Sequence, residues 1–317
     1  MNSIKMQKTI RRNISTSGLG LHSGRDIKVR LRPAPADSGI SFKRVDQPEA
    51  PVLAACPENV SSTVLATTLG RDGNKISTVE HLMAALSALH VDNILVEVDG
   101  PELPVFDGSA LKWVQLLREN GLTEQAALRR QLVVTRPFSF SVGDKSISVR
   151  PASRFSVEAH IDFGGAIGRH CFYYVDSEEA FDKEISKSRT FCLLKDVEMM
   201  HNQGLALGGS LENAVVVGDD GILNPEGLRY DDEFVRHKIL DFIGDLAMGG
   251  APVIGQFVLH KPGHDLNRRF LVEAMAQPGL LKSTVSEEKS SRPAQKRSRR
   301  LLPLPLQLAE AIPPLGL

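Results

Sequence analysis

The chain is poor in cysteine and has no excess of either charge. Its three cysteines, Cys56, Cys171 and Cys192, are scattered and include no pair with CxxC spacing. This excludes a disulfide framework and a cysteine-based zinc knuckle, and it favours a reducing compartment. Lys and Arg number 38, and Asp and Glu also number 38. Because the net charge is zero, nothing global points to a nucleic-acid partner, and any anionic substrate must be recognised by local charges.

Long apolar runs are also missing. The most apolar stretch, near residues 247–259, contains Gly, Pro and Gln and is too short to span a bilayer. Residues 1–15 are basic but lack the apolar core of a secretory signal. We therefore expect a cytoplasmic protein without a transmembrane segment.

What the chain does contain suits a globular protein with a substantial core. Apolar residues make up 42 % of its 317 residues, and charged residues make up 24 %. Strand patterns followed by helical patterns occur twice, which predicts an α+β fold with domains at 1–128 and 129–283. The segment 284–317 is polar and then rich in Leu and Pro, so we expect a mobile tail. The expected helices are 77–90, 110–120, 177–188, 232–248 and 266–276, and the expected strands include 27–31, 40–45, 93–98, 133–135, 146–150, 156–163, 214–217 and 253–259.

His237, Asp241 and Asp245 recur at intervals of four residues. On a helix this spacing places all three on one face, and two ligands one turn apart can grip one metal ion. The opposite face carries Ile239 and Leu240, which would pack inward. On spacing alone, a solvated stripe with a local ion pair is the commoner outcome. Both interpretations stand at this point.

A second segment offers a third ligand, His81, with Glu80 beside it. Three ligands would leave a fourth position open for water, and a nearby carboxylate can accept the proton of that water. However, Ser77-x-x-Glu80 also has the spacing of a capping box, in which the glutamate returns to the N–H at its own helix start. Glu80 is thus either a general base or a helix cap, because one carboxylate cannot face both ways.

His260 and His264 are also four residues apart, but Pro262 and Gly263 break the helix that shared ligation needs. We expect His264 on a turn between a strand and a helix, where it can donate a proton or stabilise an oxyanion. The alternative is a structural helix start with Asp265 as N-cap. The other histidines have no supporting partners in the sequence and are interpreted as structural or surface residues: His22, His90, His160, His170 and His201.

Seven motifs occur in order along the chain. They are Gly18-Leu-Gly-Leu-His-Ser-Gly24, Leu31-Arg-Pro-Ala-Pro-Ala36, Ile76-Ser-Thr-Val-Glu-His81, Pro104-Val-Phe-Asp-Gly-Ser109, Ser188-Arg-Thr-Phe191, Asp232-Glu-Phe-Val-Arg-His-Lys238 and Gly263-His264. In these motifs the chain resembles the UDP-3-O-acyl-N-acetylglucosamine deacetylases, the zinc amidases that commit bacteria to lipid A synthesis. The resemblance implies two similar two-layer α/β sandwich domains, packed through their helical layers with the active site between them. It also implies hydrolysis of the substrate's N-acetyl group to a free amine and acetate.

The resemblance assigns roles to individual side chains of these motifs. One catalytic Zn²⁺, with Fe²⁺ as the alternative metal, would be held by His81, His237 and Asp241. The expected catalytic groups are Glu80 as general base, His264 as general acid or electrostatic catalyst, Asp245 as the residue that orients His264, Thr190 at the oxyanion and Lys238 at the substrate's polar head. A bell-shaped pH–rate profile follows, with Glu80 on the acid limb and His264 on the alkaline limb.

In the family an inserted element holds the substrate's hydroxyacyl chain, and here it corresponds to residues 190–216. Its small and apolar residues are the candidates for an acyl channel: Phe191, Val197, Ala206, Gly209, Ser210 and Ala214. The alternative is that this stretch only packs a core and forms turns. The competing function is a catalytically silent protein that binds a nucleotide-sugar lipid, and the intact Glu80, His264 and metal ligands argue against it.

Three departures from the family pattern are present. Cys192 and Asp265 stand where small residues are usual, and the segment 63–68 lacks a cysteine that relatives often have. The tail lies outside the family core. Its basic cluster at 296–300 suggests transient contact with an anionic membrane surface, and its apolar end at 313–317 suggests recognition by a protease. We expect a monomer whose partner is the UDP-3-O-acyl-GlcNAc substrate.

Overall fold

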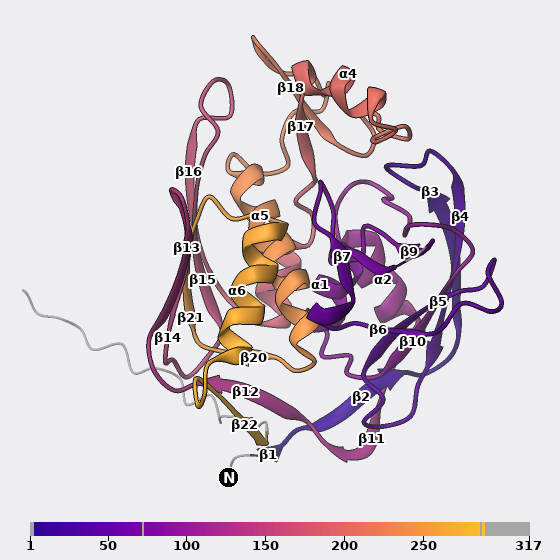
Figure 1. Cartoon of the computed structure of the whole chain (residues 1–317), viewed down its shortest axis with the longest axis vertical. Coiled ribbons are helices and arrows are strands. Elements are labelled where there is room, and N and C mark those ends of the chain that lie inside the picture. The colour runs from indigo at the N-terminus through magenta and orange to yellow at the C-terminus, as the bar shows by residue number, and fades with distance from the viewer. Residues whose placement is uncertain (1–2, 72, 286, 289–317) are drawn as a thin grey trace, which may run out of the picture.

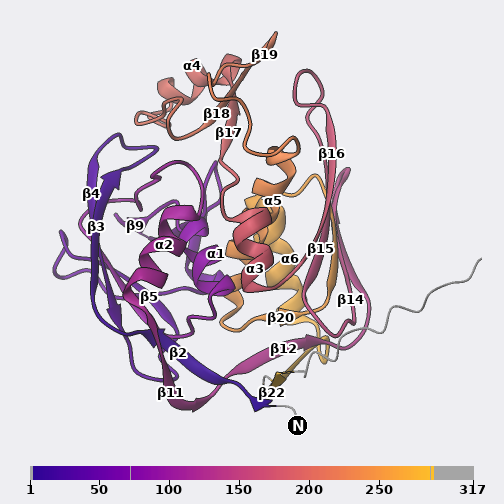
Figure 2. The same ribbon diagram turned by 180° about the vertical axis from the view of Figure 1, so that it is seen from behind.

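The computed structural model describes residues 3–71, 73–285 and 287–288. Two five-stranded sheets form the outer layers, and the main helices lie between them (Figures 1 and 2). The first sheet has the order β3 (Ile14–Leu19), β4 (Asp26–Pro33), β10 (Ile94–Val98), β5 (Ile40–Arg44) and β6 (Leu53–Ala54). The second has the order β13 (Phe138–Val142), β14 (Lys145–Arg150), β21 (Gln256–His260), β15 (Ser156–Asp162) and β16 (Arg169–Val175). The predicted α+β class is confirmed.

The two sheets share one topology. In each, the first two strands form an antiparallel hairpin, and the last strand in sequence enters the middle of the sheet. That central strand, β10 or β21, runs antiparallel to one neighbour and parallel to the other. A helix precedes and another follows each central strand: α1 (Glu80–Ala88) and α2 (Leu111–Asn120) around β10, and α5 (Glu233–Leu246) and α6 (His264–Ala276) around β21. This repeat supports a division into two domains near residue 128, which stays a prediction.

The alternation of apolar and polar residues explains why each sheet covers the helices with one face only. Along β4, Ile27, Val29 and Leu31 are buried, whereas the residues between them are exposed. Successive side chains of a strand point to opposite faces, so this pattern buries one face and leaves the other in water. The same alternation runs along β15, where Val157 and Ala159 are buried. The inward faces and the helices between them form one apolar core.

Smaller elements complete the fold. β2 (Met6–Ile10) pairs with β11 (Leu122–Leu128), β1 (Ser3–Ile4) pairs with β23 (Glu287–Glu288), and β12 (Arg130–Val134) lies between β20 (Val253–Ile254) and β22 (Leu281–Val285). Besides the β20–β12–β22 sheet, there are two further three-stranded sheets among the described residues. One consists of β7 (Val60–Ser62), β8 (Thr68–Arg71) and β9 (Asn74–Ile76), and the other of β17 (Phe191–Leu193), β18 (Val215–Gly218) and β19 (Gly221–Ile222). The short helices are η1 (Pro57–Asn59), α3 (Glu178–Ala180), the π-helical η2 (Phe181–Ile185), α4 (Leu194–Asn202) and η3 (Ala247–Gly249).

Several helices and segments begin or end at residues other than those predicted from the sequence. The helix expected at 77–90 begins only at Glu80, after the left-handed Thr78 with φ 56°. The helix expected at 177–188 is a short α-helix that continues as a π-helical turn. Within the segment from residue 284, residues 284–285 end β22 and residues 287–288 form β23. The basic cluster and the apolar end of that segment lie outside the described residues, so its mobility stays a prediction. No helix in the described part of the chain is long and apolar enough to cross a membrane.

Candidate active site

Three potential metal ligands meet where α1 and α5 pack side by side between the sheets. His81 is the second residue of α1, and His237 and Asp241 lie one turn apart on α5. Their donor atoms all lie within 4.8 Å of one another, and the Asp241 Oδ1 atom is 3.3 Å from His237 Nε2 and 3.8 Å from His81 Nε2. None of the three is more than 4 % exposed. The solvated-stripe interpretation of this spacing is therefore wrong, because α5 is covered on both faces.

The protonation of these side chains suits a cation. Burial lowers the pKa of His81 and lowers that of His237 to about 3, so both imidazoles are neutral. The ring N–H of His237 Nδ1 can donate to the Ser188 carbonyl at 3.1 Å, which leaves Nε2 free to ligate. Burial disfavours the Asp241 carboxylate, but the neighbouring charges, including Lys238 at 2.7 Å, outweigh it and hold the pKa of Asp241 low. Two neutral imidazoles and a carboxylate fit a Zn²⁺ site.

Glu80 faces this cluster and not its own helix end. It is the first residue of α1, and its Oε2 accepts the Thr67 backbone N–H at 3.0 Å. No side chain caps α1, and the Ser77 hydroxyl pairs with that of Thr68 at 2.9 Å. The capping-box interpretation is wrong, because the left-handed turn at Thr78 makes Glu80 the first helical residue and not the third. Burial raises the pKa of Glu80 to about 7.

His264 is the first residue of α6. Gly263 is the N-cap, so the assignment of that position to Asp265 is wrong. The His264 Nε2 atom lies 3.9 Å from Glu80 Oε1, and its Nδ1 lies 2.8 Å from Asp245 Oδ2. Burial opposes the charged ring, but the charges of Asp245, Asp241 and Glu80 outweigh it and raise the pKa of His264 to about 9. The ring is therefore an imidazolium at neutral pH.

Two residues that hold Asp245 were not found by sequence reasoning. The Thr67 hydroxyl donates to Asp245 Oδ1 at 2.5 Å, and the Asn267 side-chain amide donates to Oδ2 at 2.9 Å. Thr67 precedes Asp245 by 178 residues, so spacing carries no signal for this contact. Asn267 is one helical turn after His264, and that interval was the only sequence signal for it.

A buried ion pair anchors the segment that carries the Ser188 carbonyl and Thr190. The side chain of Arg189 is 1 % exposed and that of Glu233 is fully buried. Glu233 Oε1 accepts both the backbone N–H and the Nε–H of Arg189 at 2.9 Å. The next backbone N–H, that of Thr190, donates to the Gly108 carbonyl at 2.8 Å. Neither Arg189 nor Glu233 was predicted from the sequence to belong to the site.

The site opens into a cavity of about 410 Å³. It is lined by Glu80, His81, Thr190, Phe191, His237, Lys238, Asp241 and His264, together with apolar residues such as Leu21 and Leu65. The structure thus brings the predicted metal and catalytic residues to one place, with Asp245 directly behind His264. The other predicted acyl-channel residues do not line this cavity: Ala214 is buried, Val197 and Ala206 are half-buried, and Gly209 and Ser210 are exposed.

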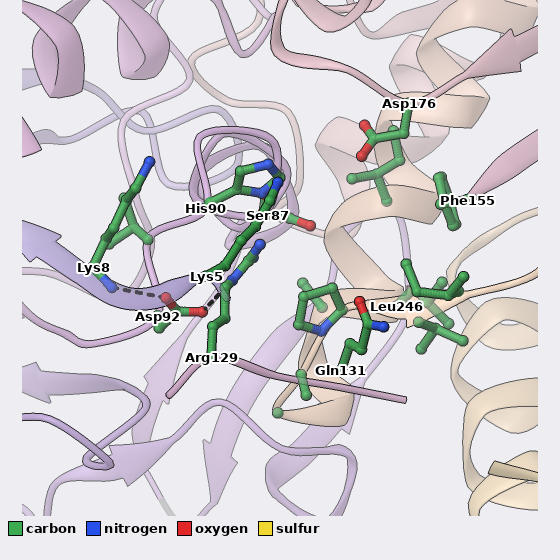
Figure 3. A pocket seen from close by; sticks show the side chains of 18 of the residues that line it. Lys5, Lys8, Ser87, His90, Asp92, Arg129, Gln131, Phe155, Asp176 and Leu246 are labelled. Carbon is green, nitrogen blue, oxygen red and sulfur yellow. Dashed lines mark hydrogen bonds and ion pairs between the residues drawn. The ribbon is translucent and has the colours of Figure 1, made fainter. Parts of the chain in front are cut away.

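A larger cavity, of about 880 Å³, lies elsewhere (Figure 3). Lys8, His90, Asp92 and Arg129 contribute to its wall, where Asp92 accepts the Lys8 backbone N–H and pairs with Arg129, both at 2.8 Å. Among the described residues, none of the predicted metal or catalytic groups lines it. A large volume alone is therefore not evidence of a reactive site. The smaller cavity is the better candidate, because it is lined by the potential metal ligands together with Glu80 and His264.

Comparison with known proteins agrees with this geometry. The family model described as LpxC, UDP-3-O-acyl N-acetylglycosamine deacetylase, matches residues 7–276. Similar proteins named UDP-3-O-acyl-N-acetylglucosamine deacetylase include those of Syntrophus aciditrophicus (46 % identical over 272 residues, 86 % of each chain), Anaeromyxobacter sp. strain Fw109-5 (44 % over 308 residues, 96 % of this chain and 98 % of the relative) and Marinobacter nauticus (43 % over 290 residues, 90 % and 95 %). On this coverage and identity, the chain belongs to the UDP-3-O-acyl-N-acetylglucosamine deacetylase family.

Proposed function

We propose that this protein removes the N-acetyl group of UDP-3-O-acyl-N-acetylglucosamine by hydrolysis, as the committed step of lipid A biosynthesis. The observation that carries the proposal is the meeting of a buried His/His/Asp cluster, a carboxylate and an imidazolium at one cavity. Family membership supplies the substrate, because the relatives carry its name. The products are the free amine and acetate.

We assign His81, His237 and Asp241 as the ligands of one catalytic zinc ion, with ferrous iron as the alternative. The donor set fits because both imidazoles are neutral and the carboxylate is ionised. When bound, such an ion polarises a carbonyl and lowers the pKa of water toward 7. Lys238 donates to Asp241 Oδ2, so Oδ1, the oxygen nearer both imidazoles, would be the ligand atom of Asp241.

Glu80 and His264 divide the proton transfers between them. Glu80 is the general base that takes a proton from the attacking water, and a pKa near 7 suits this role at neutral pH. His264, held protonated by Asp245, stabilises negative charge and delivers a proton to the leaving amine. Because their side chains are 3.9 Å apart across the cavity, one acetamide group can contact both.

Thr190 and Lys238 complete the polar wall of the cavity. We assign Thr190 as a donor to the developing oxyanion. This is supported by its position in the cavity wall and by the bond from its backbone N–H to the Gly108 carbonyl. The Lys238 ammonium lies 5.3 Å from the centre of the Phe191 ring and remains partly exposed. From there it can meet the substrate's polar head.

The element at 190–216 supports an acyl-binding role. It contains β17 and α4, which project together from one end of the molecule (Figure 1). Phe191 begins β17 at the cavity wall. Large apolar side chains beyond it are exposed: Leu194 at 50 %, Met199 at 54 %, Leu207 at 54 % and Leu211 at 38 %. An apolar chain that leaves the cavity past Phe191 would cover such surface. Each Å² of apolar surface removed from water would stabilise the complex by about 25 cal/mol.

The test is deacetylation of the UDP-sugar substrate by native, chelated and zinc-reconstituted protein, with metal analysis of each. We expect chelation to abolish hydrolysis and zinc to restore it. His237→Ala should contain fewer metal ions per chain than the wild type treated in the same way and be inactive, whereas His90→Asn, in the larger cavity, should resemble the wild type. Full activity in metal-free protein would defeat the proposal. Substrate binding without hydrolysis in the zinc-loaded wild type would instead favour the silent binding protein.

A further inference from the structure

A second cluster of metal-ligand side chains lies on the outer face of the β13–β16 sheet. Glu158 and His160 belong to β15, and Cys171 belongs to β16. Along β15 the intervening residues Val157 and Ala159 are buried. Because successive side chains of a strand alternate between faces, Glu158 and His160 point away from the helices that cover the inner face. This cluster is therefore separate from the site between α1 and α5.

Strand register brings these residues together. His160 is directly opposite Cys171 in the antiparallel pair β15–β16. On the other side of β15, His160 is opposite His260 of β21, and the two rings stack with centroids 4.8 Å apart. Three neighbouring strands thus place His260, His160 and Cys171 in one row, with Glu158 two residues from His160. No partner was predicted for His160 from the sequence, because strand register alone brings Cys171 and His260 to it.

The distances are close to those of a coordination shell. The donor atoms of Glu158, His160 and Cys171 lie within 4.8 Å of one another. His160 Nε2 is 2.9 Å from Glu158 Oε1 and 3.9 Å from Cys171 Sγ. Around a tetrahedral zinc ion with bonds of about 2.0–2.3 Å, neighbouring donors are roughly 3.3–3.5 Å apart. Shifts of about 0.4 Å, within the reach of ordinary side-chain rotation, would bring both separations to those values.

The chemistry of the set is selective. Thiolate, imidazole and carboxylate together suit Zn²⁺ and related transition metals, whereas Mg²⁺ and Ca²⁺ prefer oxygen alone. Glu158 and His160 are half-buried and Cys171 is exposed, so an ion can enter from solvent. We propose that Glu158, His160 and Cys171 form a second, non-catalytic site for a divalent transition metal.

Cobalt(II) tests this directly, because it occupies zinc sites and its thiolate complexes absorb strongly in the near ultraviolet. The assigned catalytic ligands contain no sulfur, so only a cysteine-containing site can produce that band. We expect the band in the wild-type protein, its loss in Cys171→Ser and its retention in Cys56→Ser and Cys192→Ser. Absence of the band in the wild type, or its survival in Cys171→Ser, would overturn the proposal.

Metal stoichiometry gives an independent measurement. After equilibrium dialysis against zinc, we expect two ions per chain in the wild type and one in His160→Ala, with deacetylase activity equal in both. A His160→Ala protein that still binds two ions would contradict the site. The substitutions are on the outward face of a strand, and circular dichroism checks that the fold is retained. Because the readout is metal content, the result is independent of the proposed catalytic function.

Discussion

Gly244 of α5 lies directly against the backbone of Glu80 in α1. A β-carbon on Gly244 would stand 2.1 Å from the Glu80 carbonyl oxygen and 2.8 Å from its carbonyl carbon. Real β-carbons do not approach backbone so closely, so only glycine permits this contact between the helices. The helix that presents the candidate general base is thereby held against the helix that presents His237 and Asp241. The close approach of α1 and α5 sets the dimensions of the site.

Gly244→Ala should therefore separate the two helices. We expect the free energy of unfolding to fall by about 1–3 kcal/mol, the usual cost of overpacking. Displacement of Glu80 by about 1 Å should lower kcat/KM by up to about 10²-fold. Urea denaturation and steady-state kinetics measure both effects. The matched control is Gly249→Ala, whose β-carbon would meet only the Leu271 side chain at 3.4 Å. Equal behaviour of the two variants would show that the helix contact has no special role.

Glu80→Gln keeps the shape of the side chain and removes its basicity. We expect kcat to fall by about 10²–10⁴-fold, the typical contribution of general base catalysis. Zinc content should be unchanged, because Glu80 is not among the assigned ligands. Glu97→Gln, at a surface pair with Arg32, serves as the control and should be fully active. If Glu80→Gln has the kcat of the wild type, Glu80 is not the general base.

The pH dependence should have two limbs. Activity rises with pH as Glu80, with its pKa near 7, loses its proton and becomes a base. It falls again as His264, with its pKa near 9, loses the proton that it must donate. Asp245→Asn removes the adjacent negative charge and so lowers the pKa of His264. We expect the alkaline limb of the kcat/KM profile to move to lower pH in this variant. If the alkaline limb stays near pH 9 in Asp245→Asn, the limb does not report the loss of a proton from His264.

The buried Arg189–Glu233 pair predicts a stability defect far larger than that of a surface pair. Glu233→Gln leaves the Arg189 guanidinium short of its buried counter-charge, which should cost about 3–5 kcal/mol of unfolding free energy. Since Ser188 precedes Arg189 and accepts from His237, zinc affinity should also fall, by about 10–100-fold. Denaturation midpoints and zinc titration measure these changes. Glu179→Gln, at the exposed Lys183 pair, should leave both unchanged; a matching loss there would contradict the prediction.

Local patterns were sufficient for the principal elements. The alternation along β4 and the four-residue spacing of His237, Asp241 and Asp245 are properties of neighbouring residues, so a strand and a one-sided helix face follow from them. The ordered motifs were sufficient for the family, which the comparison confirmed. The residue spacing gave a wrong prediction where one backbone conformation decided the structure. Ser77-x-x-Glu80 has the spacing of a capping box, but the left-handed conformation of Thr78 makes Glu80 line the cavity instead of capping α1.

The sequence by itself determined the residue types available for chemistry, the α+β class and the family. Only the tertiary structure decided that the α5 stripe is buried, that Thr67 and Asn267 hold Asp245, and that both sheets repeat one topology. It also decided that His160 and Cys171 meet across two strands. The physical reason is the same in each case. These contacts join residues far apart in the chain, and their distances follow from helix packing and strand register, which leave no periodic trace in the sequence.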